Sequence, residues 1–108
     1  MNQQSKAISS SGEQPTLLDV SLVLPCYGRP SQTIELLESI RRANFRCEVI
    51  LVDDCSPEPL SVVIESFADL DIRYIRNENN SGAAFSRNVG ARAATQSLVA
   101  FTDKRLHC

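Results

Sequence analysis

The stretch EVILVDDCSPEP, residues 48–59, contains four consecutive aliphatic residues followed directly by two acidic ones, Asp53 and Asp54. A short apolar run that ends in turn-forming residues predicts a strand buried on both faces. Unpaired carboxylates are costly to bury, and two adjacent ones repel each other. The pair therefore marks either the point where the chain reaches the surface or a place where a ligand is bound.

Working outward from this strand, similar apolar runs alternate with helical patterns. We predict four strands, over residues 20–24, 47–52, 71–77 and 97–103, and three helices, near residues 31–43, 57–68 and 82–94. The first helix is expected to bury Ile34, Leu37 and Ile40 with Leu36 beside them, and the second to bury Leu60, Val63, Ile64 and Phe67. The turn residues predict how each helix begins. Pro30 is expected in the first turn of the first helix, and Ser56 is expected to cap the second helix just before Pro57. Asn80 or Ser81 is expected to cap the third helix.

This alternation predicts an α/β fold with an open parallel sheet of about four strands, because parallel neighbours need helical crossovers. We expect the strand order 3-2-1-4, with helices on both faces of the sheet. The strand over residues 71–77 is more polar and is expected at an edge. Residues 1–17 lack periodicity and predict a disordered tail, and residues 18–108 are expected to form one domain.

Composition excludes several classes of protein. The net charge is −2 and there is no run of Lys or Arg, which argues against a nucleic-acid partner. No apolar segment approaches the roughly 20 residues that span a bilayer, and the N-terminus lacks the apolar core of a secretory signal. These features predict a cytoplasmic protein, or the cytoplasmic face of a longer membrane-bound chain. The four cysteines lack zinc-site spacing and are expected to be free thiols: Cys26, Cys47, Cys55 and Cys108.

Ligands of open parallel sheets bind at the carboxyl ends of the strands. The predicted strand ends bring together one aromatic and four polar residues, Tyr27, Asp53, Asp54, Asn80 and Asp103. Such a set suits a nucleotide, whose base could stack on Tyr27 while an aspartate accepts a base N–H or a ribose hydroxyl. The helix N-terminus near Gly82, with Arg87, would face phosphate. The alternative is structural, since an aspartate at a strand end often only turns the chain.

The order and spacing of four motifs resemble family 2 glycosyltransferases of the GT-A fold. The matching segments are VSLVLPCYGRP (residues 20–30), EVILVDDCSPE (48–58), NENNSGAAFSRNVG (77–90) and LVAFTD (98–103). The family pattern is roughly P-x-Y-N after the first strand, D-D-x-S after the second, N-x-G-x-x-x-x-R-N-x-G into the third helix, and D-x-D after the fourth strand. Gly28 stands where the family usually has Asn.

The resemblance implies a nucleotide-sugar donor, most often a UDP-sugar, and hexosyl or related transfer. Carried over residue by residue, Pro25 and Tyr27 would flank the base and Asp54 would hydrogen-bond it, with Asp53 alongside. Gly82, Arg87 and Asn88 would shape the diphosphate side of the donor site.

The resemblance weakens at the C-terminal end. The family's D-x-D motif binds Mg²⁺ or Mn²⁺, which prefer hard oxygen ligands. Here Asp103 matches the first aspartate, but Arg105 stands in place of the second. We therefore expect this chain to hold a divalent cation poorly. The family's acceptor site and catalytic base are expected beyond residue 108, so the sequence predicts a truncated domain without transfer activity. Such a domain would expose apolar sheet surface and could form a homodimer through it.

Two other classes of function stay open on the sequence alone. One is a receiver-like signalling domain, which would use Asp53 as its phosphoacceptor and Lys104 after the last strand. Its acidic pair should follow the first strand, where this chain has PCYG. The other is a non-catalytic nucleotide-binding module.

Overall fold

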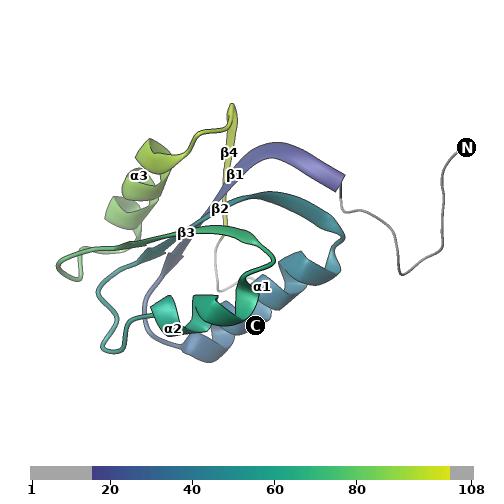
Figure 1. Ribbon diagram of the computed structural model, residues 1–108. Coiled ribbons are helices and arrows are strands. Elements are labelled where there is room, and N and C mark those ends of the chain that lie inside the picture. The colour runs from purple at the N-terminus through teal and green to yellow at the C-terminus, as the bar shows by residue number, and fades with distance from the viewer. Residues whose placement is uncertain (1–15, 103–108) are drawn as a thin grey trace, which may run out of the picture.

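The computed structural model describes residues 16–102 as a single sheet flanked by helices (Figure 1). In chain order the elements are β1 (Thr16–Cys26), α1 (Pro30–Arg42), β2 (Phe45–Asp53), α2 (Ser61–Ile64), the 3₁₀ turn η2 (Glu65–Phe67), β3 (Asp71–Arg76), α3 (Ala83–Ala93) and β4 (Leu98–Phe101). Within these residues no helix is both long enough and apolar enough to cross a membrane.

The four strands form one parallel sheet in the order β3-β2-β1-β4. This confirms the predicted fold class, strand order and parallel pairing. It also places the more polar β3 at an edge, as expected. The two central strands, β1 and β2, carry the longest buried apolar runs because helices cover them from both sides.

β1 is longer than predicted, since it begins at Thr16 rather than at Val20. Its first residues pair with the start of β2, and an irregularity in register separates Leu17 from Ser21. The tail predicted over residues 1–17 lies outside the described residues, except for its last two, which open β1.

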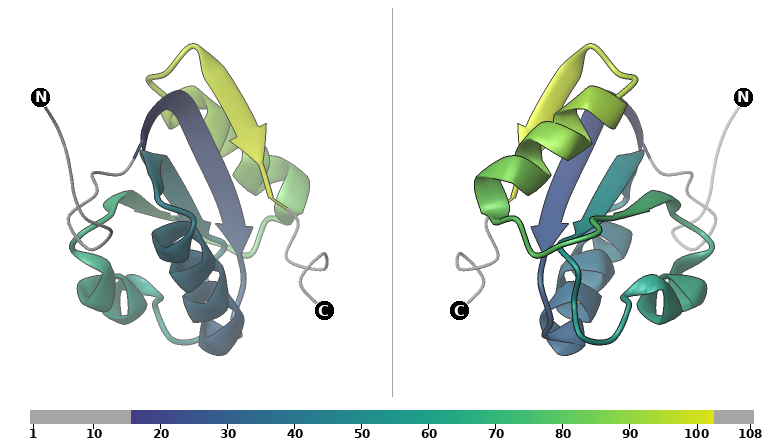
Figure 2. Two further views of the ribbon diagram at one scale, coloured as in Figure 1. Left: turned by 90° about the vertical axis from the view of Figure 1, so that its right-hand side faces the viewer. Right: turned by 90° about the vertical axis from the view of Figure 1, so that its left-hand side faces the viewer.

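One face of the sheet packs against α1 and α2, and the opposite face packs against α3 (Figure 2). The α1 side holds the larger core. Its buried members are Leu24, Cys26, Leu36, Leu37, Ile40, Cys47, Val49, Leu51, Leu60, Phe67 and Leu70. In α1 the buried stripe runs through Thr33, Leu36, Leu37 and Ile40, so the prediction that Ile34 joins it was wrong. Ile34 is 40% exposed, because the stripe at positions i, i+3, i+4 and i+7 starts one residue earlier.

The second helix begins at Ser61, four residues later than predicted, and Ser56 is not its cap. The backbone N–H of Ser56 donates to Asp53 Oδ1 at 2.9 Å, and the N–H of Leu60 donates to Asp53 Oδ2 at 3.0 Å. The segment from Ser56 to Leu60 is therefore folded around the Asp53 carboxylate, and the helix starts only after it. Leu60 and Phe67 are buried as predicted.

α3 lies close to the sheet because Gly90 faces it. A Cβ atom at Gly90 would lie 2.3 Å from Val23 Cγ1 and 3.2 Å from Val52 Cγ2. Val23, Ile50 and Val52 form the small core on this side of the sheet, with Ile75, Val89 and Ala93 packed around it. The helix could not approach so closely with any larger residue at position 90.

We predict that Gly90→Ala destabilises the protein by about 1–3 kcal/mol, the usual result of overpacking a core. This is opposite to the gain of roughly 1 kcal/mol expected for Gly→Ala inside a helix. Chemical denaturation of the variant measures the change, and Val23→Ala combined with Gly90→Ala should recover part of the loss. Equal or greater stability of Gly90→Ala alone would contradict the close packing.

Candidate functional site

Three strands end at the same level and form the edge of the sheet where a ligand is expected. Cys26, the last residue of β1, pairs in register with Asp53, the last residue of β2, and Asp53 pairs with Arg76 at the end of β3. Two further backbone hydrogen bonds of 2.8 Å extend this pairing, from Asp54 N to Cys26 O and from Asn77 N to Asp53 O. The residues that follow each strand are therefore held side by side.

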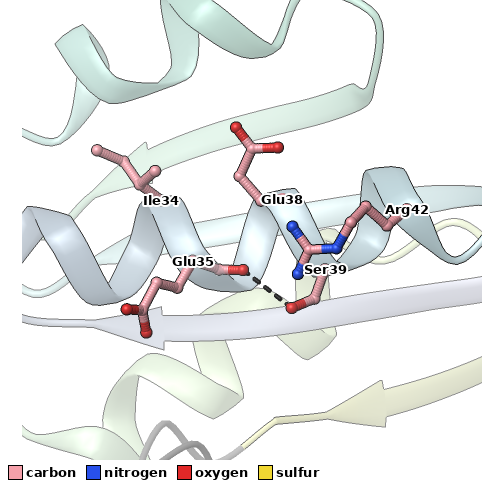
Figure 3. Close-up of a pocket in the computed structure, with 5 residues that line it drawn as sticks. All are labelled: Ile34, Glu35, Glu38, Ser39 and Arg42. Atoms are coloured by element: carbon pink, nitrogen blue, oxygen red, sulfur yellow. Dashed lines mark hydrogen bonds between the residues drawn. The ribbon is translucent and has the colours of Figure 1, made fainter.

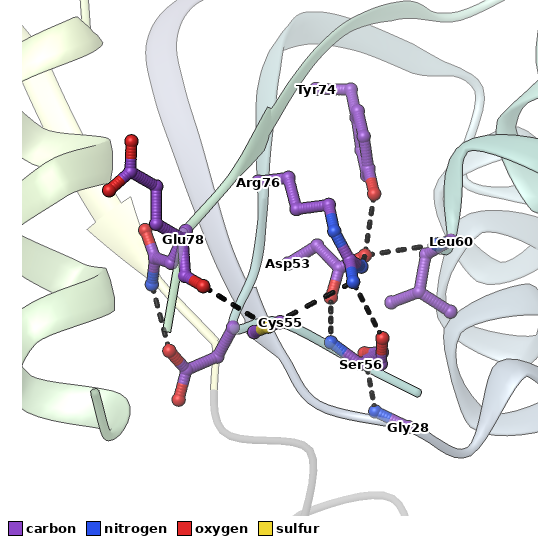
Figure 4. Close-up of polar contacts among 10 residues, drawn as sticks. Gly28, Asp53, Cys55, Ser56, Leu60, Tyr74, Arg76 and Glu78 are labelled. Carbon is purple, nitrogen blue, oxygen red and sulfur yellow. Dashed lines mark hydrogen bonds and ion pairs between the residues drawn. The ribbon is translucent and has the colours of Figure 1, made fainter. Parts of the chain in front are cut away.

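Asp53 is fully buried and accepts hydrogen bonds from several directions (Figure 4). Besides the N–H groups of Ser56 and Leu60, Oδ2 accepts from Tyr74 Oη at 2.5 Å and pairs with Arg76 Nη1 at 3.0 Å. Tyr74 and Arg76 are two residues apart on β3 and so point to the same side of the strand. The carboxylate thus joins β2, β3 and the loop that precedes α2.

These contacts explain why a carboxylate is tolerated there. Burial raises the pKa of Asp53, but hydrogen bonds from Ser56, Tyr74 and the Leu60 backbone outweigh it and lower the pKa to about 2. The group is ionised at neutral pH, with Arg76 as its countercharge. Arg76 Nη2 also donates to Ser56 O at 2.9 Å, and Ser56 Oγ accepts from Gly28 N at 2.7 Å, which ties the loop after β1 to the same cluster.

Asp54 is directed to the other neighbour, the N-terminus of α3. Its Oδ1 accepts from Ser81 N and Asn77 Nδ2, and its Oδ2 accepts from Gly82 N, each at 2.8 Å. Gly82, at φ 96°, is the capping position of α3, and no side chain from its own loop caps the helix. The predicted cap at Asn80 or Ser81 was wrong, because Gly82 occupies the capping position. The carboxylate of Asp54, 28 residues away from Gly82 in sequence, instead accepts the N–H groups of Ser81 and Gly82 just before the helix.

A cavity of about 80 Å³ opens beside Asp54. Its lining residues come from the end of β1, the end of β2 and the first turn of α3: Pro25, Cys26, Tyr27, Asp54, Ala83 and Ser86. Tyr27 is 47% exposed at its mouth, whereas Asp54 is buried. The cavity therefore combines an accessible aromatic ring with a carboxylate that is an acceptor only, which suits a flat heterocycle that carries an N–H group.

The structure thus brings together three of the residues predicted to bind a nucleotide, Pro25, Tyr27 and Asp54. Asp53 does not line the cavity, because its carboxylate is directed to the loop before α2 and to β3. Arg87 and Asn88 lie on α3, exposed and outside the lining. Asp103 lies outside the described residues. Among residues 16–102 no group of three or more His, Cys, Asp or Glu side chains could hold a metal ion.

A larger hollow, of about 400 Å³, lies on the outer face of α1 (Figure 3). Its lining residues are Ile34, Glu35, Glu38, Ser39 and Arg42. The Ser39 hydroxyl donates to Glu35 O at 3.0 Å within the helix, so this hollow is an ordinary polar helix surface. All of its lining residues belong to α1, and none lies in a loop that follows a strand.

Sequence reasoning missed several residues that build the site, namely Ser56, Tyr74, Arg76, Asn77 and Ser86. Tyr74 and Arg76 had a usable signal, since alternate polar residues on an edge strand must share one face. The roles of Asn77 and Ser86 had none, because their hydrogen bond of 3.0 Å joins a loop to a helix only in the folded chain.

Residues 21–104, most of the chain, match the family described as glycosyl transferase family 2. The chain belongs to this family. Among its relatives, a glycosyltransferase of Haemophilus influenzae described as uncharacterized is 44% identical over 85 residues, which are 78% of this chain and 28% of that protein. The hyaluronan synthase of Pasteurella multocida is 34% identical over 89 residues, which are 78% of this chain and 9% of the synthase.

The fold of this family 2 chain also matches solved structures. A mannosyltransferase from Pyrobaculum calidifontis, in complex with GDP-Man and Mn²⁺, superimposes with a TM-score of 0.72 at 25% identity. The match covers 86% of this chain and 28% of the mannosyltransferase. The chain therefore spans less than a third of the length of each of these relatives.

Family membership decides against the receiver-like alternative. The buried Asp53 gives the same answer independently, because a phosphoacceptor must be reachable and Asp53 is 0% exposed. Its carboxylate is already occupied by four donors from Ser56, Leu60, Tyr74 and Arg76.

We predict that Asp53→Asn lowers the free energy of unfolding by about 3 kcal/mol, the order found when one partner of a buried charge cluster is removed. An amide NH₂ in place of either oxygen puts a donor where the carboxylate now accepts at least one hydrogen bond. Denaturant unfolding measures the loss. Asp69→Asn is the matched control, because Asp69 pairs with Arg41 at the surface and should matter little.

The pH dependence has a defined sign. The pKa of Asp53 falls from 3.8 to about 2 on folding, so its contribution of about 2 kcal/mol is present above pH about 4. The contribution is lost as pH falls from about 4 to about 2. The stability difference between the wild type and Asp53→Asn should shrink over this window, and a difference independent of pH would contradict the assignment.

Proposed function

We propose that this chain supplies the donor-binding part of a family 2 glycosyltransferase domain and that the cavity beside Asp54 receives the base of a nucleotide-sugar. The observation that carries the proposal is the lining of that cavity. It places an exposed aromatic ring, Tyr27, and an ionised acceptor, Asp54, at the carboxyl ends of β1 and β2, where open parallel sheets bind their ligands.

The chemistry of Asp54 selects the kind of base. Burial raises its pKa, but hydrogen bonds from Ser81, Asn77 and Gly82 outweigh burial and lower it, so the group is an ionised acceptor at neutral pH. It can receive the ring N–H of uracil or guanine. The corresponding ring nitrogen of cytosine or adenine carries no hydrogen and would face the carboxylate with a lone pair. The small cavity favours the single ring of uracil, so a UDP-sugar is the proposed donor.

The diphosphate would extend past the first turn of α3 toward Arg87 and Asn88. The N–H of Gly82 is already donated to Asp54, so Gly82 would contribute its backbone shape rather than a hydrogen bond. Its φ of 96° is a conformation that other residues rarely adopt. The three residues predicted on the diphosphate side, Gly82, Arg87 and Asn88, are all exposed.

The family's metal chemistry fits this chain poorly. The resemblance implies a divalent cation, which Asp103 and a second carboxylate would hold and which would supply positive charge near the donor diphosphate. This sequence offers Asp103 followed by Lys104 and Arg105, a donor set that replaces the second carboxylate ligand by a cation. We propose that nucleotide binding here depends on Tyr27 and Asp54 rather than on a metal ion.

Because the chain spans less than a third of the length of its relatives, we also propose that these 108 residues do not transfer sugar by themselves. The cytoplasmic location stays a prediction.

Titration calorimetry with four nucleoside monophosphates tests the proposal. We expect UMP to bind weakly but at least tenfold more tightly than CMP, and GMP more tightly than AMP, because the ring nitrogen of each disfavoured base turns a lone pair, instead of an N–H, toward the carboxylate. UDP affinity should fall on Asp54→Ala and change little on addition of Mn²⁺. Glu65→Ala, an exposed acid on η2, is the control. Equal binding of UMP and CMP would refute the base site, and a strong Mn²⁺ dependence would refute the metal argument.

We further propose that the chain self-associates through β4. All four residues of β4 are exposed, with Leu98 at 65% and Phe101 at 47%. Among the described strands none pairs with its outer edge. An unpaired apolar edge strand is a template for pairing with a second copy.

Light scattering over a range of concentrations checks this. We expect a mass above that of the monomer for the wild type, a shift toward monomer for Leu98→Lys, and no shift for Leu17→Lys. Leu17 is 80% exposed but lies on β1, which makes it a matched control. A monomer mass at high concentration of the wild type would contradict self-association.

A further inference from the structure

Asn77 has an unusual position for a polar residue, because it is buried and all of its described hydrogen bonds end at the candidate site. It directly follows β3 and is 8% exposed. Its backbone N–H donates to Asp53 O at 2.8 Å, and its side-chain Nδ2 donates both to Asp54 Oδ1 at 2.8 Å and to Ser86 Oγ at 3.0 Å. The side chain therefore bridges the end of β2 and the first turn of α3.

The acceptor positions of Asp54 can be counted. An ionised carboxylate has about four lone-pair positions, two on each oxygen. Oδ1 accepts from Asn77 Nδ2 and Ser81 N, and Oδ2 accepts from Gly82 N. Counting donors from residues 16–102, one position is left, and it belongs to Oδ2.

Of the three described donors to Asp54, two are backbone N–H groups and only Asn77 donates from a side chain. Its amide has two hydrogens, and Ser86 accepts the second. Ser86 is fully buried and lines the cavity wall next to Asp54. Both hydrogens of the amide are thus used, so the amide cannot rotate without losing a buried hydrogen bond.

We infer that Asn77, held by Ser86, is a positioning residue that fills Oδ1 of Asp54 and leaves Oδ2 as the atom that accepts the N–H of the nucleotide base. The inference rests on the proposed function. It adds a residue that does not line the cavity and acts only through Asp54. Without Asn77, Oδ1 would have an empty acceptor position and the carboxylate could turn to offer either oxygen.

The experiment compares Asn77→Ala, Asn77→Asp and Ser86→Ala with the wild type. We expect Asn77→Ala to bind UMP about tenfold more weakly at neutral pH, the usual effect of one lost hydrogen bond to a charged group, and to lose part of the preference for UMP over CMP. Ser86→Ala should show a smaller loss. Ser81→Ala is the matched control, because its hydroxyl donates to Asn79 O while its backbone N–H still reaches Asp54.

Asn77→Asp gives a readout that a merely structural role would not produce. At neutral pH a second carboxylate would repel Asp54 and raise its pKa, so UMP binding should be weak. On acidification the two groups share a proton, and the protonated carboxyl donates to Asp54 again. UMP affinity of this variant should therefore recover as pH falls, whereas that of the wild type should not rise.

NMR titration of the Asp54 carboxyl carbon measures the same contact without any nucleotide. Its pKa should rise in Asn77→Ala and be unchanged in Ser81→Ala. An unchanged pKa, or UMP binding by a folded Asn77→Ala equal to that of the wild type, would overturn the inference. If Asn77→Ala does not fold, Ser86→Ala carries the test with the same two outcomes. A wild type that shows the expected pKa pattern but does not bind UMP would instead refute the proposed function, and with it the assignment of Oδ2 to a base.

Discussion

The carboxylate of Asp53 is the contact on which the carboxyl edge of the sheet depends. It is fully buried, and it gathers donors from Ser56, Leu60, Tyr74 and Arg76. An ionised group in the interior is stable only when such donors surround it. The carboxylate and its donors therefore stabilise one another. This makes the loop before α2 and the end of β3 parts of one cluster.

The neighbouring Asp54 shows what that cluster makes possible. Asp54 directly follows the last residue of β2 and continues its pairing with β1. Side chains of adjacent residues in extended chain point to opposite faces, so the two aspartates contact different neighbours. Asp53 binds the α2 loop and β3, whereas Asp54 binds the N-terminus of α3. Asp54 accepts three described hydrogen bonds of its own, and under the proposed function its remaining acceptor position receives the base. The question raised by two adjacent acids at the end of a buried strand is answered by this division of roles.

The two sides of the sheet contribute differently to the site. On the α1 side a large core fixes the strands. On the α3 side the core is small, and Gly90 lets the helix lie directly on Val23 and Val52. Close packing there sets the height of the first turn of α3 above the sheet. That height determines where Ala83 and Ser86 stand relative to Asp54, and so determines the width of the cavity.

The sequence by itself determined the class of fold, the strand order and the family, because apolar runs, helical stripes and motif spacing are local properties of the chain. It also placed Tyr27 and Asp54 at one edge, since the ends of parallel strands must meet. The tertiary structure alone decided what binds the loop that leads into α3, where α2 begins, and which of the two acids faces the cavity. Each of these depends on a hydrogen bond between residues brought together by folding, such as Gly82 N to Asp54 across 28 positions. A local pattern holds no record of a partner that distant. Ser56 was predicted as a cap, but its hydroxyl accepts the N–H of Gly28, 28 positions away.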